Sequence, residues 1–330
     1  MQYLGEMLSL GVAVLWTATA LFADAAGRRL GAMTLNAIRL IFATIFIALI
    51  LFFATGSPYP LYAGGKAWYY LALSAVVGYL FGDYCLFSSY LVIGARFGQL
   101  FMTLAPPSAA IAAWIMLGER LSGKSWIAMA ITLSGIAISI LSRQKVDSRT
   151  HEEDGNATAT NSHKGGHKLA LTLPVKGVFL GIGAGVGQGV GLVLSKMGME
   201  HYSADIPQNA PTLMHHIMPF AATMIRAIVG AIGFVAIIAL RKDLKRLLYS
   251  YREKKGFSNA LLTTIFGPFL GVSLSLMAVQ YADAGIASTL MALTPVLIIL
   301  PYSLIYKQKI KPREVIGVVV SMVGVAMFFL

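Results

Sequence analysis

Three charged residues that could carry chemistry lie inside long apolar stretches of the sequence: Asp83, Arg39 and Arg226. An ionised side chain at the centre of a bilayer costs about 2.5–3.5 kcal/mol on insertion scales, so such a residue is by default a functional candidate. Asp83 could bind a substrate directly, or it could take up and release a proton. The alternatives are a structural ion pair with Arg39 or Arg226, or contact with a watery vestibule.

The two arginines occupy matching positions, each after an isoleucine and a few residues into its apolar stretch. A guanidinium group can hold a carboxylate or phosphate through two parallel hydrogen bonds, so Arg39 and Arg226 could recognise an anionic group of a substrate. They could instead extend to the membrane interface. Their depth favours the interface, and both remain candidates for the substrate or proton pathway.

Five further side chains are candidates for lining such a pathway: Gln188, Trp16, Tyr84, Gln99 and Gln280. Gln188 lies in a run in which every second residue from Gly181 to Gly191 is glycine. Small residues let helices pack closely, and we favour this interpretation of the run. The alternative is a floor for a substrate, with Gln188 as its hydrogen-bonding group.

Four prolines lie inside the two apolar stretches at 97–117 and 286–306: Pro106, Pro107, Pro295 and Pro301. A proline removes the hydrogen bond to the carbonyl four residues earlier. A helix broken in this way offers polar atoms at membrane depth and a place to bend. Static kinks would explain the same residues, but we favour a hinge or a binding site because Pro106 and Pro295 recur in a sequence repeat described below.

Nucleotide binding and metal binding are weakly supported by the sequence. Residues 118–125 match the phosphate-binding pattern G-x-x-x-x-G-K-[ST], but that loop needs a preceding strand in an α/β domain, and here it joins two apolar stretches. His151, His163 and His167 lack the close spacing of metal ligands. We therefore expect no catalytic residues, no cofactor and no metal, and we expect that the protein is not an enzyme.

The elements that must position these residues are membrane-spanning helices. Apolar residues make up 57% of the chain and charged residues only 12%, against about 45–50% and 25% in soluble domains. In hydrocarbon every backbone polar group must be bonded within its own segment, which predicts helices. The predicted spans are Leu4–Ala26, Leu35–Thr55, Trp68–Val92, Phe97–Leu117, Trp126–Leu141, Val175–Met197, Leu213–Leu240, Ala260–Tyr281, Ile286–Tyr306 and Val315–Leu330.

Basic residues predict how the chain lies in the membrane. The formal net charge of +12 could indicate a nucleic-acid partner, but the lysines and arginines cluster between the apolar stretches. Segments after the odd-numbered stretches hold 20 of them, and those after the even-numbered stretches hold 3. Cytoplasmic loops are enriched in Lys and Arg. We therefore expect a lipid-embedded protein with both termini outside the cytoplasm and no nucleic-acid partner.

The chain contains an internal repeat. When the sequence is shifted by 189 residues, positions 78–141 fall on positions 267–330 without a gap. The matched pairs include Gly78 with Gly267, Gly82 with Gly271, Pro106 with Pro295 and Gly135 with Gly324. Apolar composition alone does not explain glycines and prolines in register. An odd number of spans in each half would turn the halves upside down relative to each other, as in many secondary transporters.

The repeated segments also carry a family resemblance. Residues 95–119 (ARFGQLFMTLAPPSAAIAAWIMLGE) and their second copy at 284–314 resemble the EamA-type branch of the drug/metabolite transporter superfamily. The resemblance implies residues 1–141 as a first five-helix repeat and residues 173–330 as a second. Residues 142–172 between them contain almost no apolar side chains, which predicts a polar flexible linker. It implies a permease in a bacterial cytoplasmic (inner) membrane, with a cavity lined by spans one, three, four, six, eight and nine.

We therefore predict an all-α integral membrane protein with ten transmembrane helices arranged as two inverted five-helix repeats. Its expected function is secondary transport, by alternating access, of a small-molecule substrate such as an amino acid, a related metabolite or a drug. Export is favoured, and Asp83 is the candidate for proton coupling. The alternatives are a non-transporting sensor or channel and an intramembrane enzyme. The sequence does not indicate the substrate or the oligomeric state.

Overall fold

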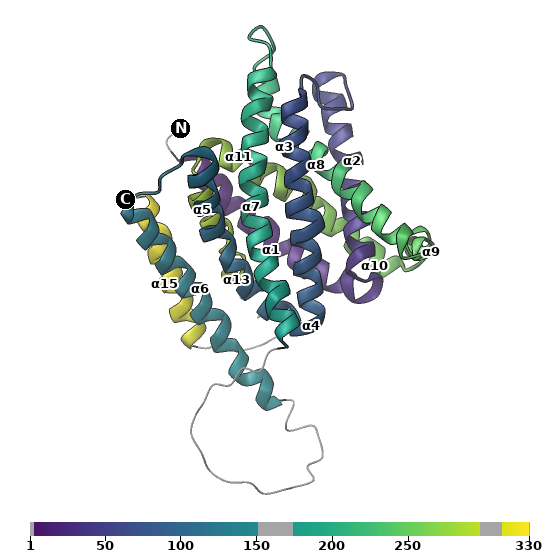
Figure 1. Ribbon diagram of the computed structural model, residues 1–330. Helices are drawn as coiled ribbons and strands as arrows, with labels where there is room; N and C mark the ends of the chain where they lie inside the picture. Colours follow the sequence, from purple (N-terminus) through teal and green to yellow (C-terminus); the bar gives the residue numbers. More distant parts are fainter. Residues whose placement is uncertain (1–2, 151–173, 298–311, 330) are drawn as a thin grey trace, which may run out of the picture.

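The computed structural model describes residues 3–150, 174–297 and 312–329, and within them every regular element is a helix (Figure 1). The first half contains α1 (Leu4–Leu30), α2 (Ala32–Thr55), α3 (Gly65–Ala75), η1 (Val76–Asp83), α4 (Tyr84–Phe101), η2 (Met102–Leu104), α5 (Ala105–Leu117) and α6 (Gly123–Thr150). The second contains α7 (Val175–Asp205), α8 (Leu213–Leu240), α9 (Leu244–Leu248), η3 (Ser250–Arg252), α10 (Lys254–Thr264), η4 (Ile265–Gly271), α11 (Val272–Tyr281), α12 (Ala284–Met291), α13 (Thr294–Leu297) and α15 (Pro312–Phe329).

Six helical segments in the described residues are long and apolar enough to cross a membrane. They are Leu4–Leu30, Ala32–Thr55, Gly65–Tyr90, Val175–Asp205, Leu213–Leu240 and Lys254–Tyr281. Three shorter apolar helices cover Met102–Leu117, Gly123–Ile138 and Val315–Phe329. The prediction of an all-helical membrane protein is confirmed at this level. The ninth predicted span, Ile286–Tyr306, extends beyond the described residues.

The surface of the bundle is apolar where lipid would touch it. Phe53 is 82% exposed, Ile115 72% and Ile232 65%, and these residues come from α2, α5 and α8. Large apolar side chains are also exposed on α1, α7 and α15. Exposed apolar surface of this extent marks a surface that is covered in the native setting. The helices therefore expose apolar side chains outward and enclose their buried polar groups, as an integral membrane protein requires.

Helix α6 is longer than the sequence predicted. The predicted linker begins at Ser142, yet α6 continues to Thr150 (Figure 1). No glycine or proline lies between Ser142 and Thr150, and Arg, Gln and Lys have good helix propensity. The polar character of this stretch predicted a loop, whereas its backbone preferences allow the helix to continue. The rest of the predicted linker lies outside the described residues.

Two spans contain a π-helical turn at the same position of the sequence repeat. The turn η1 covers Val76–Asp83 in the first half, and η4 covers Ile265–Gly271 in the second. Adding 189 to the first residue of η1 gives the first residue of η4. Such turns are rare inside α-helices and occur frequently at functional sites. The sequence repeat is thus matched by a repeated irregularity of the backbone.

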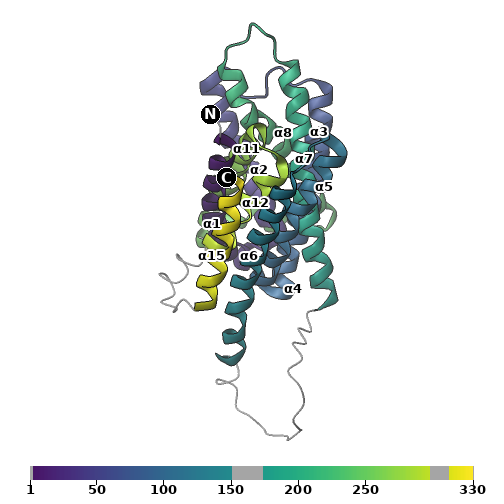
Figure 2. The same cartoon turned by 90° about the vertical axis from the view of Figure 1, so that its left-hand side faces the viewer.

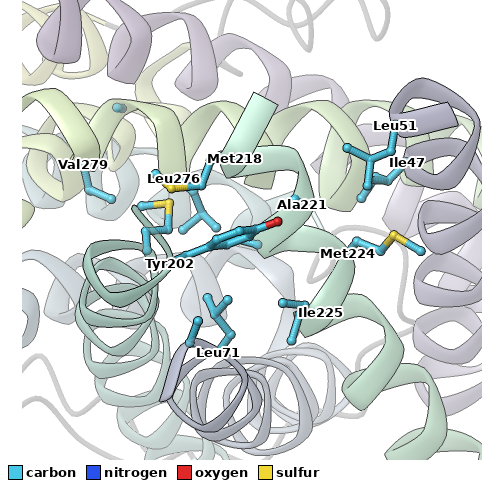
Figure 3. Packing of buried hydrophobic residues seen from close by; sticks show 14 of the residues in the cluster. Ile47, Leu51, Leu71, Tyr202, Met218, Ala221, Met224, Ile225, Leu276 and Val279 are labelled. Carbon is cyan, nitrogen blue, oxygen red and sulfur yellow. The ribbon is translucent and has the colours of Figure 1, made fainter. Parts of the chain in front are cut away.

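The largest cluster of buried apolar residues joins the two halves (Figure 3). Ile47 of α2 and Leu71 of α3 share it with Tyr202 of α7, Ile225 of α8 and Leu276 of α11. In a bilayer the hydrophobic effect does not drive helix association, so close packing of such side chains must supply the stability. Because one cluster takes residues from both halves, the halves do not form separate cores.

Helices α6 and α15 pack side by side (Figure 2) through residues that correspond in the repeat. A Cβ atom added at Gly135 would lie 2.6 Å from the carbonyl oxygen of Gly317, and one added at Gly324 would lie 2.9 Å from that of Ala128. Ser321 also donates a hydrogen bond to the carbonyl oxygen of Thr132, at 3.3 Å. The residue numbers at the contacts rise along α6 as they fall along α15, so the two helices run antiparallel.

This packing predicts two matched losses of stability. Gly135→Ala and Gly324→Ala should each lower the unfolding free energy by about 1–3 kcal/mol, because the added methyl group meets backbone atoms that no side-chain rotation can move. Thermal unfolding of the purified protein would measure the effect. Gly123→Ala in α6 is the control, since no atom lies within 4 Å of its added Cβ. Equal melting temperatures for all three variants would contradict the packing.

Candidate functional site

A cavity of about 160 Å³ lies between helices of both halves. Its wall combines apolar, hydroxyl and ionisable side chains from spans one to four and from their counterparts in the second half. The lining residues are Trp16, Thr19, Ala20, Ala23, Arg39, Tyr79, Asp83, Leu86, Phe87, Tyr90, Met102, Thr103, Ala105, Gln188, Leu192, Arg226, Gly267, Val272, Ser275, Ser288, Met291, Ala292 and Thr294.

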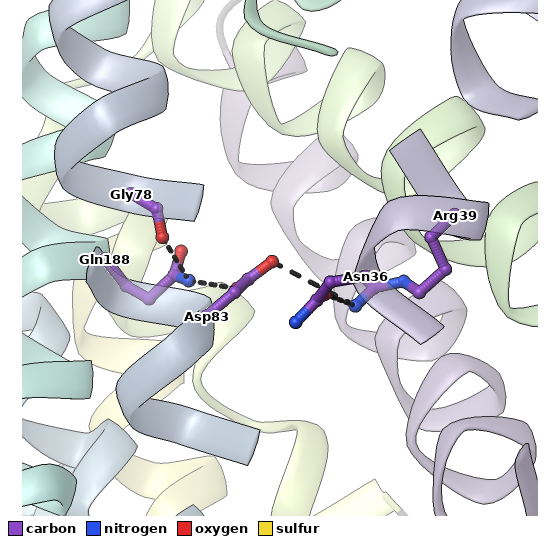
Figure 4. A network of polar contacts seen from close by, with 5 residues as sticks. All are labelled: Asn36, Arg39, Gly78, Asp83 and Gln188. Atoms are coloured by element: carbon purple, nitrogen blue, oxygen red, sulfur yellow. Dashed lines mark hydrogen bonds and ion pairs between the residues drawn. The ribbon is translucent and has the colours of Figure 1, made fainter. Parts of the chain in front are cut away.

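A network of polar contacts crosses this cavity wall (Figure 4). Gln188 Nε2 donates hydrogen bonds to Asp83 Oδ1 at 2.5 Å and to the carbonyl oxygen of Gly78 at 3.2 Å. The other carboxylate oxygen, Oδ2 of Asp83, lies 4.0 Å from Arg39 Nη1, which donates to Asn36 Oδ1 at 3.0 Å. Asp83 is therefore bound firmly on the Gln188 side and loosely on the Arg39 side.

Arg226 is held differently from Arg39. Its guanidinium carbon lies 4.6 Å from the centroid of the Tyr79 ring, a cation–π arrangement. Arg226 is only 4% exposed, and neither a hydrogen bond nor an ion pair joins it to any residue that the structure describes. Neither arginine reaches the interface as the snorkelling interpretation required, because both are buried and line the cavity.

Each arginine lies against the π-helical turn of the opposite half. A Cβ atom added at Gly78 of η1 would be 3.2 Å from Arg226 Nη2, and one added at Gly267 of η4 would be 3.3 Å from Arg39 Nη2. Gly78 and Gly267 correspond in the repeat. The absence of a side chain at each glycine leaves the room that the opposing guanidinium group occupies, so the arginine positions depend on both halves.

A second pair of contacts follows the same exchange between halves. A Cβ atom added at Gly82 of η1 would be 3.3 Å from Gln188 Nε2, and one added at Gly271 of η4 would be 2.8 Å from Trp16 Nε1. Gln188 comes from α7 and Trp16 from α1, the first helix of each half. The sequence repeat did not predict that Gln188 and Trp16 make corresponding contacts, because their residue types differ.

The glycine run of α7 packs directly on η1. A Cβ atom at Gly187 would be 3.0 Å from the Cα of Gly82, and one at Gly191 would be 2.9 Å from the Cα of Gly78. Two pairs of glycines, each spaced by four residues, thus allow backbone-to-backbone contact, as the close-packing interpretation predicted. Gln188 lies between them, which explains how its amide reaches both Asp83 and the carbonyl oxygen of Gly78.

Both halves also interrupt a helix at the cavity. The α4–α5 helix narrows to the 3₁₀ turn η2 at Met102–Leu104, ahead of Pro106 and Pro107 in the first turn of α5. In the second half α12 ends at Met291 and α13 begins at Thr294. Met102 and Met291, which correspond in the repeat, both line the cavity. The Pro295 side chain and the whole of Pro301 lie outside the described part of the chain.

Two of the remaining predicted residues, Tyr84 and Gln280, are not brought to this cavity. Tyr84 packs beside Cys85 and Leu86, next to the cavity wall, and does not line it. Gln280 of α11 also lies away from it, with Oε1 buried and lacking a partner among the described residues. The Gln99 side chain is outside the described part of the chain.

Among the residues in direct contact with the buried charges, sequence reasoning missed Tyr79 and Asn36. Tyr79 precedes Asp83 by four residues, and Asn36 precedes Arg39 by three. These spacings place side chains on one face of a helix, so each could have been found as a neighbour of a buried charge. Within the described ranges no group of three His, Cys, Asp or Glu side chains is arranged to hold a metal ion.

A second charged cluster lies away from the cavity, two turns further along α7 than Gln188. Lys196 Nζ lies 2.5 Å from Glu119 Oε1, with both side chains 14% exposed. Lys196 also donates to the carbonyl oxygen of Ala282 at 3.0 Å, and Glu119 Oε2 accepts from the backbone N–H of Ala284 at 3.0 Å. The cluster ties the α5–α6 connection, α7 and the α11–α12 turn together.

Asp283 precedes α12 beside this cluster. Burial raises the pKa of the Asp283 carboxyl, the neighbouring Glu119 carboxylate raises it further, and the Lys196 ammonium group opposes both. The ionised form of Asp283 is therefore disfavoured relative to an aspartate in water.

Helices that expose apolar side chains and enclose a partly polar cavity indicate an integral membrane protein. The chain belongs to the EamA-like transporter family, whose model matches residues 3–141 and 209–330. The predicted family resemblance is thereby confirmed.

The fold is similar to that of a solved structure titled "Crystal structure of protein", with a TM-score of 0.67. The two chains are 15% identical, and the match covers 99% of this chain and 96% of the other. At this identity the likeness concerns the fold alone. No curated protein matches the chain.

The polar network predicts a stability effect at Gln188. Gln188→Leu should lower the unfolding free energy by about 1–3 kcal/mol, because Asp83 and the carbonyl of Gly78 would both lose their donor. Thermal unfolding in detergent is the measurement. Gln280→Leu is the matched control, since the Oε1 atom of Gln280 has no partner to lose. Equal destabilisation by the two substitutions would show that the network contributes nothing.

Asp283 predicts a pH-dependent effect of known sign. A carboxyl whose pKa is raised by folding favours the folded state most when it is protonated, and this contribution is lost as the pH rises through the folded pKa. Asp283→Asn, which keeps a good N-cap residue, should therefore raise the melting temperature at neutral pH. The gain should shrink as the pH falls toward 3.8, the ordinary pKa of aspartate.

The control for Asp283 is Asp243→Asn, since Asp243 is exposed and also precedes a helix, α9. It should show no comparable gain at neutral pH. A lower melting temperature for Asp283→Asn at neutral pH, with no change on acidification, would contradict the assigned environment.

Proposed function

We propose that this protein is a secondary transporter that moves a small metabolite across the membrane by alternating access. Amino acids, related metabolites and drug-like molecules are the candidate substrates, and export is the favoured direction. The observation that carries the proposal is the cavity whose wall is built from corresponding residues of two halves. Family membership supports transport in general.

The proposed architecture is ten membrane spans in two inverted repeats, residues 1–141 and 173–330, joined by residues 142–172. Four observations support it. The family match falls in two regions, the π-helical turns repeat at a shift of 189, α6 and α15 pack antiparallel through corresponding residues, and each arginine faces the glycine of the opposite half. Inverted halves of this kind can exchange their conformations, which would open the cavity first to one side and then to the other.

The helix interruptions would provide the bending points for this exchange. In each half, the break lies at the cavity wall and follows the same position of the repeat, at Met102 and at Met291. A span that is divided there can change the direction of one segment without breaking a continuous hydrogen-bonded helix. Pro106 and Pro107 would act in the first half, and Pro295 with Pro301 in the second.

Asp83 is the proposed site of proton coupling. Its carboxylate lies 4.0 Å from Arg39, so the pair is attracted without a direct hydrogen bond between them. Protonation would remove that attraction and free the Arg39 guanidinium to turn toward a bound solute. Deprotonation would restore it. In this way, proton uptake by Asp83 would change the affinity of the cavity for its solute.

The proposed setting is a bacterial cytoplasmic membrane with both termini outside the cytoplasm. The basis is the distribution of Lys and Arg between the two sets of connecting segments. We further propose that the protein performs no enzymatic reaction.

Transport can be tested with the purified full-length protein in liposomes. Influx and counterflow of radiolabelled amino acids and of a lipophilic cationic drug would be measured with and without a pH gradient. Wild type should carry at least one of these solutes, and Asp83→Asn should lose the response of flux to the gradient. Asp243→Asn, in an exposed connection, is the control and should behave as wild type.

Two outcomes would contradict this account. The absence of flux for every solute by wild-type protein would remove the transporter proposal. Unchanged flux and unchanged pH dependence in Asp83→Asn would leave transport standing and remove Asp83 from the coupling step.

A further inference from the structure

Arg226 carries a buried positive charge that the described protein does not neutralise. It is 4% exposed, its Nε atom is buried without a hydrogen-bond partner, and its guanidinium group lies over the Tyr79 ring and against Gly78. An ionised group removed from water is costly unless it is paired and hydrogen-bonded. Since guanidinium stays protonated in proteins, the cost cannot be relieved by losing the proton.

The other ionisable residues of the cavity do not supply the missing partner. The lining contains the two arginines and a single carboxylate, that of Asp83. Asp83 accepts its hydrogen bond from Gln188 and lies 4.0 Å from Arg39, whereas no ion pair of that length joins it to Arg226 among the described residues. With Asp83 ionised the wall carries one excess positive charge, and Arg226 is the arginine without an ion pair among the described residues.

Groups near Arg226 and Arg39 that lack a partner are hydrogen-bond donors. Tyr79 O–H, Arg39 Nε and Arg226 Nε are all buried, line or adjoin the cavity, and have no partner among the described residues. A ligand that satisfies them must present acceptors. A planar or tetrahedral oxyanion matches the guanidinium fork through two hydrogen bonds and also supplies the missing negative charge.

The rest of the cavity wall would contact an apolar body. Leu86, Phe87, Met102, Leu192 and Met291 all line the same space. A free inorganic anion would leave these side chains without contacts, whereas an organic acid would place its charged end at Arg226 and its hydrocarbon part among them. Ligand sites typically combine such apolar walls with a few polar groups that fix orientation.

We propose that Arg226, together with the hydroxyl group of Tyr79, is the oxyanion-binding subsite of the cavity, and that its ligand is a small organic acid with an apolar body. The charged group is a carboxylate or a phosphate. This rests on the proposed function, because it assigns a substrate class to the same cavity. Arg39, attracted to Asp83, does not take this role while Asp83 is ionised.

Binding to the full-length protein in an uncharged detergent tests the subsite without reference to transport. Three probes share a phenyl group: 3-phenylpropionate, phenyl phosphate and the neutral 3-phenylpropanamide. At least one of the two anions should bind wild type and raise its melting temperature, and the amide should bind at least tenfold more weakly. The stronger anion identifies the group as carboxylate or phosphate.

The variants assign the effect to Arg226. Arg226→Gln should weaken binding of the anion roughly tenfold to a hundredfold and leave the weak binding of the amide unchanged. Arg226→Lys should be intermediate, because an ammonium group keeps the charge but cannot form the fork. Arg241→Gln, at the exposed end of the same helix, should bind as wild type.

If Arg226→Gln does not fold, Tyr79→Phe replaces it, since it keeps the ring under the guanidinium and removes only the donor. Severalfold weaker anion binding is then expected. Equal binding of anions and amide to wild type, no binding of any of the three, or anion binding unchanged in the variants would each overturn the subsite.

The liposome assay keeps this test separate from the proposed function. Anion binding that depends on Arg226, in a protein that carries no solute, would retain the subsite and refute transport. Flux of a neutral solute, together with anion binding that is unchanged in Arg226→Gln, would retain transport and refute the subsite.

Discussion

Holding ionised groups inside an apolar bundle is the constraint on which the rest of this structure depends. Asp83 is 7% exposed, Arg39 8% and Arg226 4%, in helices whose outer surfaces are apolar. Only Asp83 and Arg39 face each other, and at 4.0 Å they do not form a direct hydrogen bond. Gln188 donates a hydrogen bond to Asp83, and Asn36 accepts one from Arg39. The rings of Phe87 and Tyr79 lie against Arg39 and Arg226, respectively. The glycines at 78, 267 and 82 leave this polar space open, because an added Cβ atom would lie 3.2–3.3 Å from the arginines and Gln188.

The scaffold and the two arginines are repeated in both halves, but the carboxylate is not. Arg39 and Arg226 correspond, as do the glycines that they face, whereas the counterpart of Asp83 is Val272, and both of these line the cavity. On the proposed mechanism a proton therefore binds one half only. Its binding would favour one of the two conformations over the other, and a proton gradient across the membrane would then set the direction of transport.

The sequence predicted those parts of the fold that depend on local composition. Apolar stretches became helices, and the glycines at 187 and 191 allow close packing on η1 as expected. It failed where helix propensity and polarity disagreed, since the residues from Ser142 to Thr150 are polar and yet continue α6. The π-helical turns carried no recognised signal, because their glycines fit an ordinary close-packed helix equally well.

The candidate site was predicted in its charged residues and missed in its supporting ones. Asp83, Arg39 and Arg226 stand out because ionised side chains are rare in apolar stretches. Their depth was judged from the distance along each stretch, which predicted interfacial arginines, whereas α2 and α8 bury both against the opposite half. Tyr79 and Asn36 carry no charge, and their roles depend on neighbours that only the folded bundle supplies.

The central claim is that corresponding residues of the two halves face opposite sides of the membrane around one cavity. Lys66 and Lys255 correspond at the shift of 189, and both are exposed. The native cysteine, Cys85, is buried and can be replaced by alanine. Single cysteines at positions 66 and 255, labelled with a membrane-impermeant maleimide in right-side-out and inverted vesicles, should react from opposite sides. Labelling of both positions from the same side would contradict the inverted arrangement and the transport mechanism built on it.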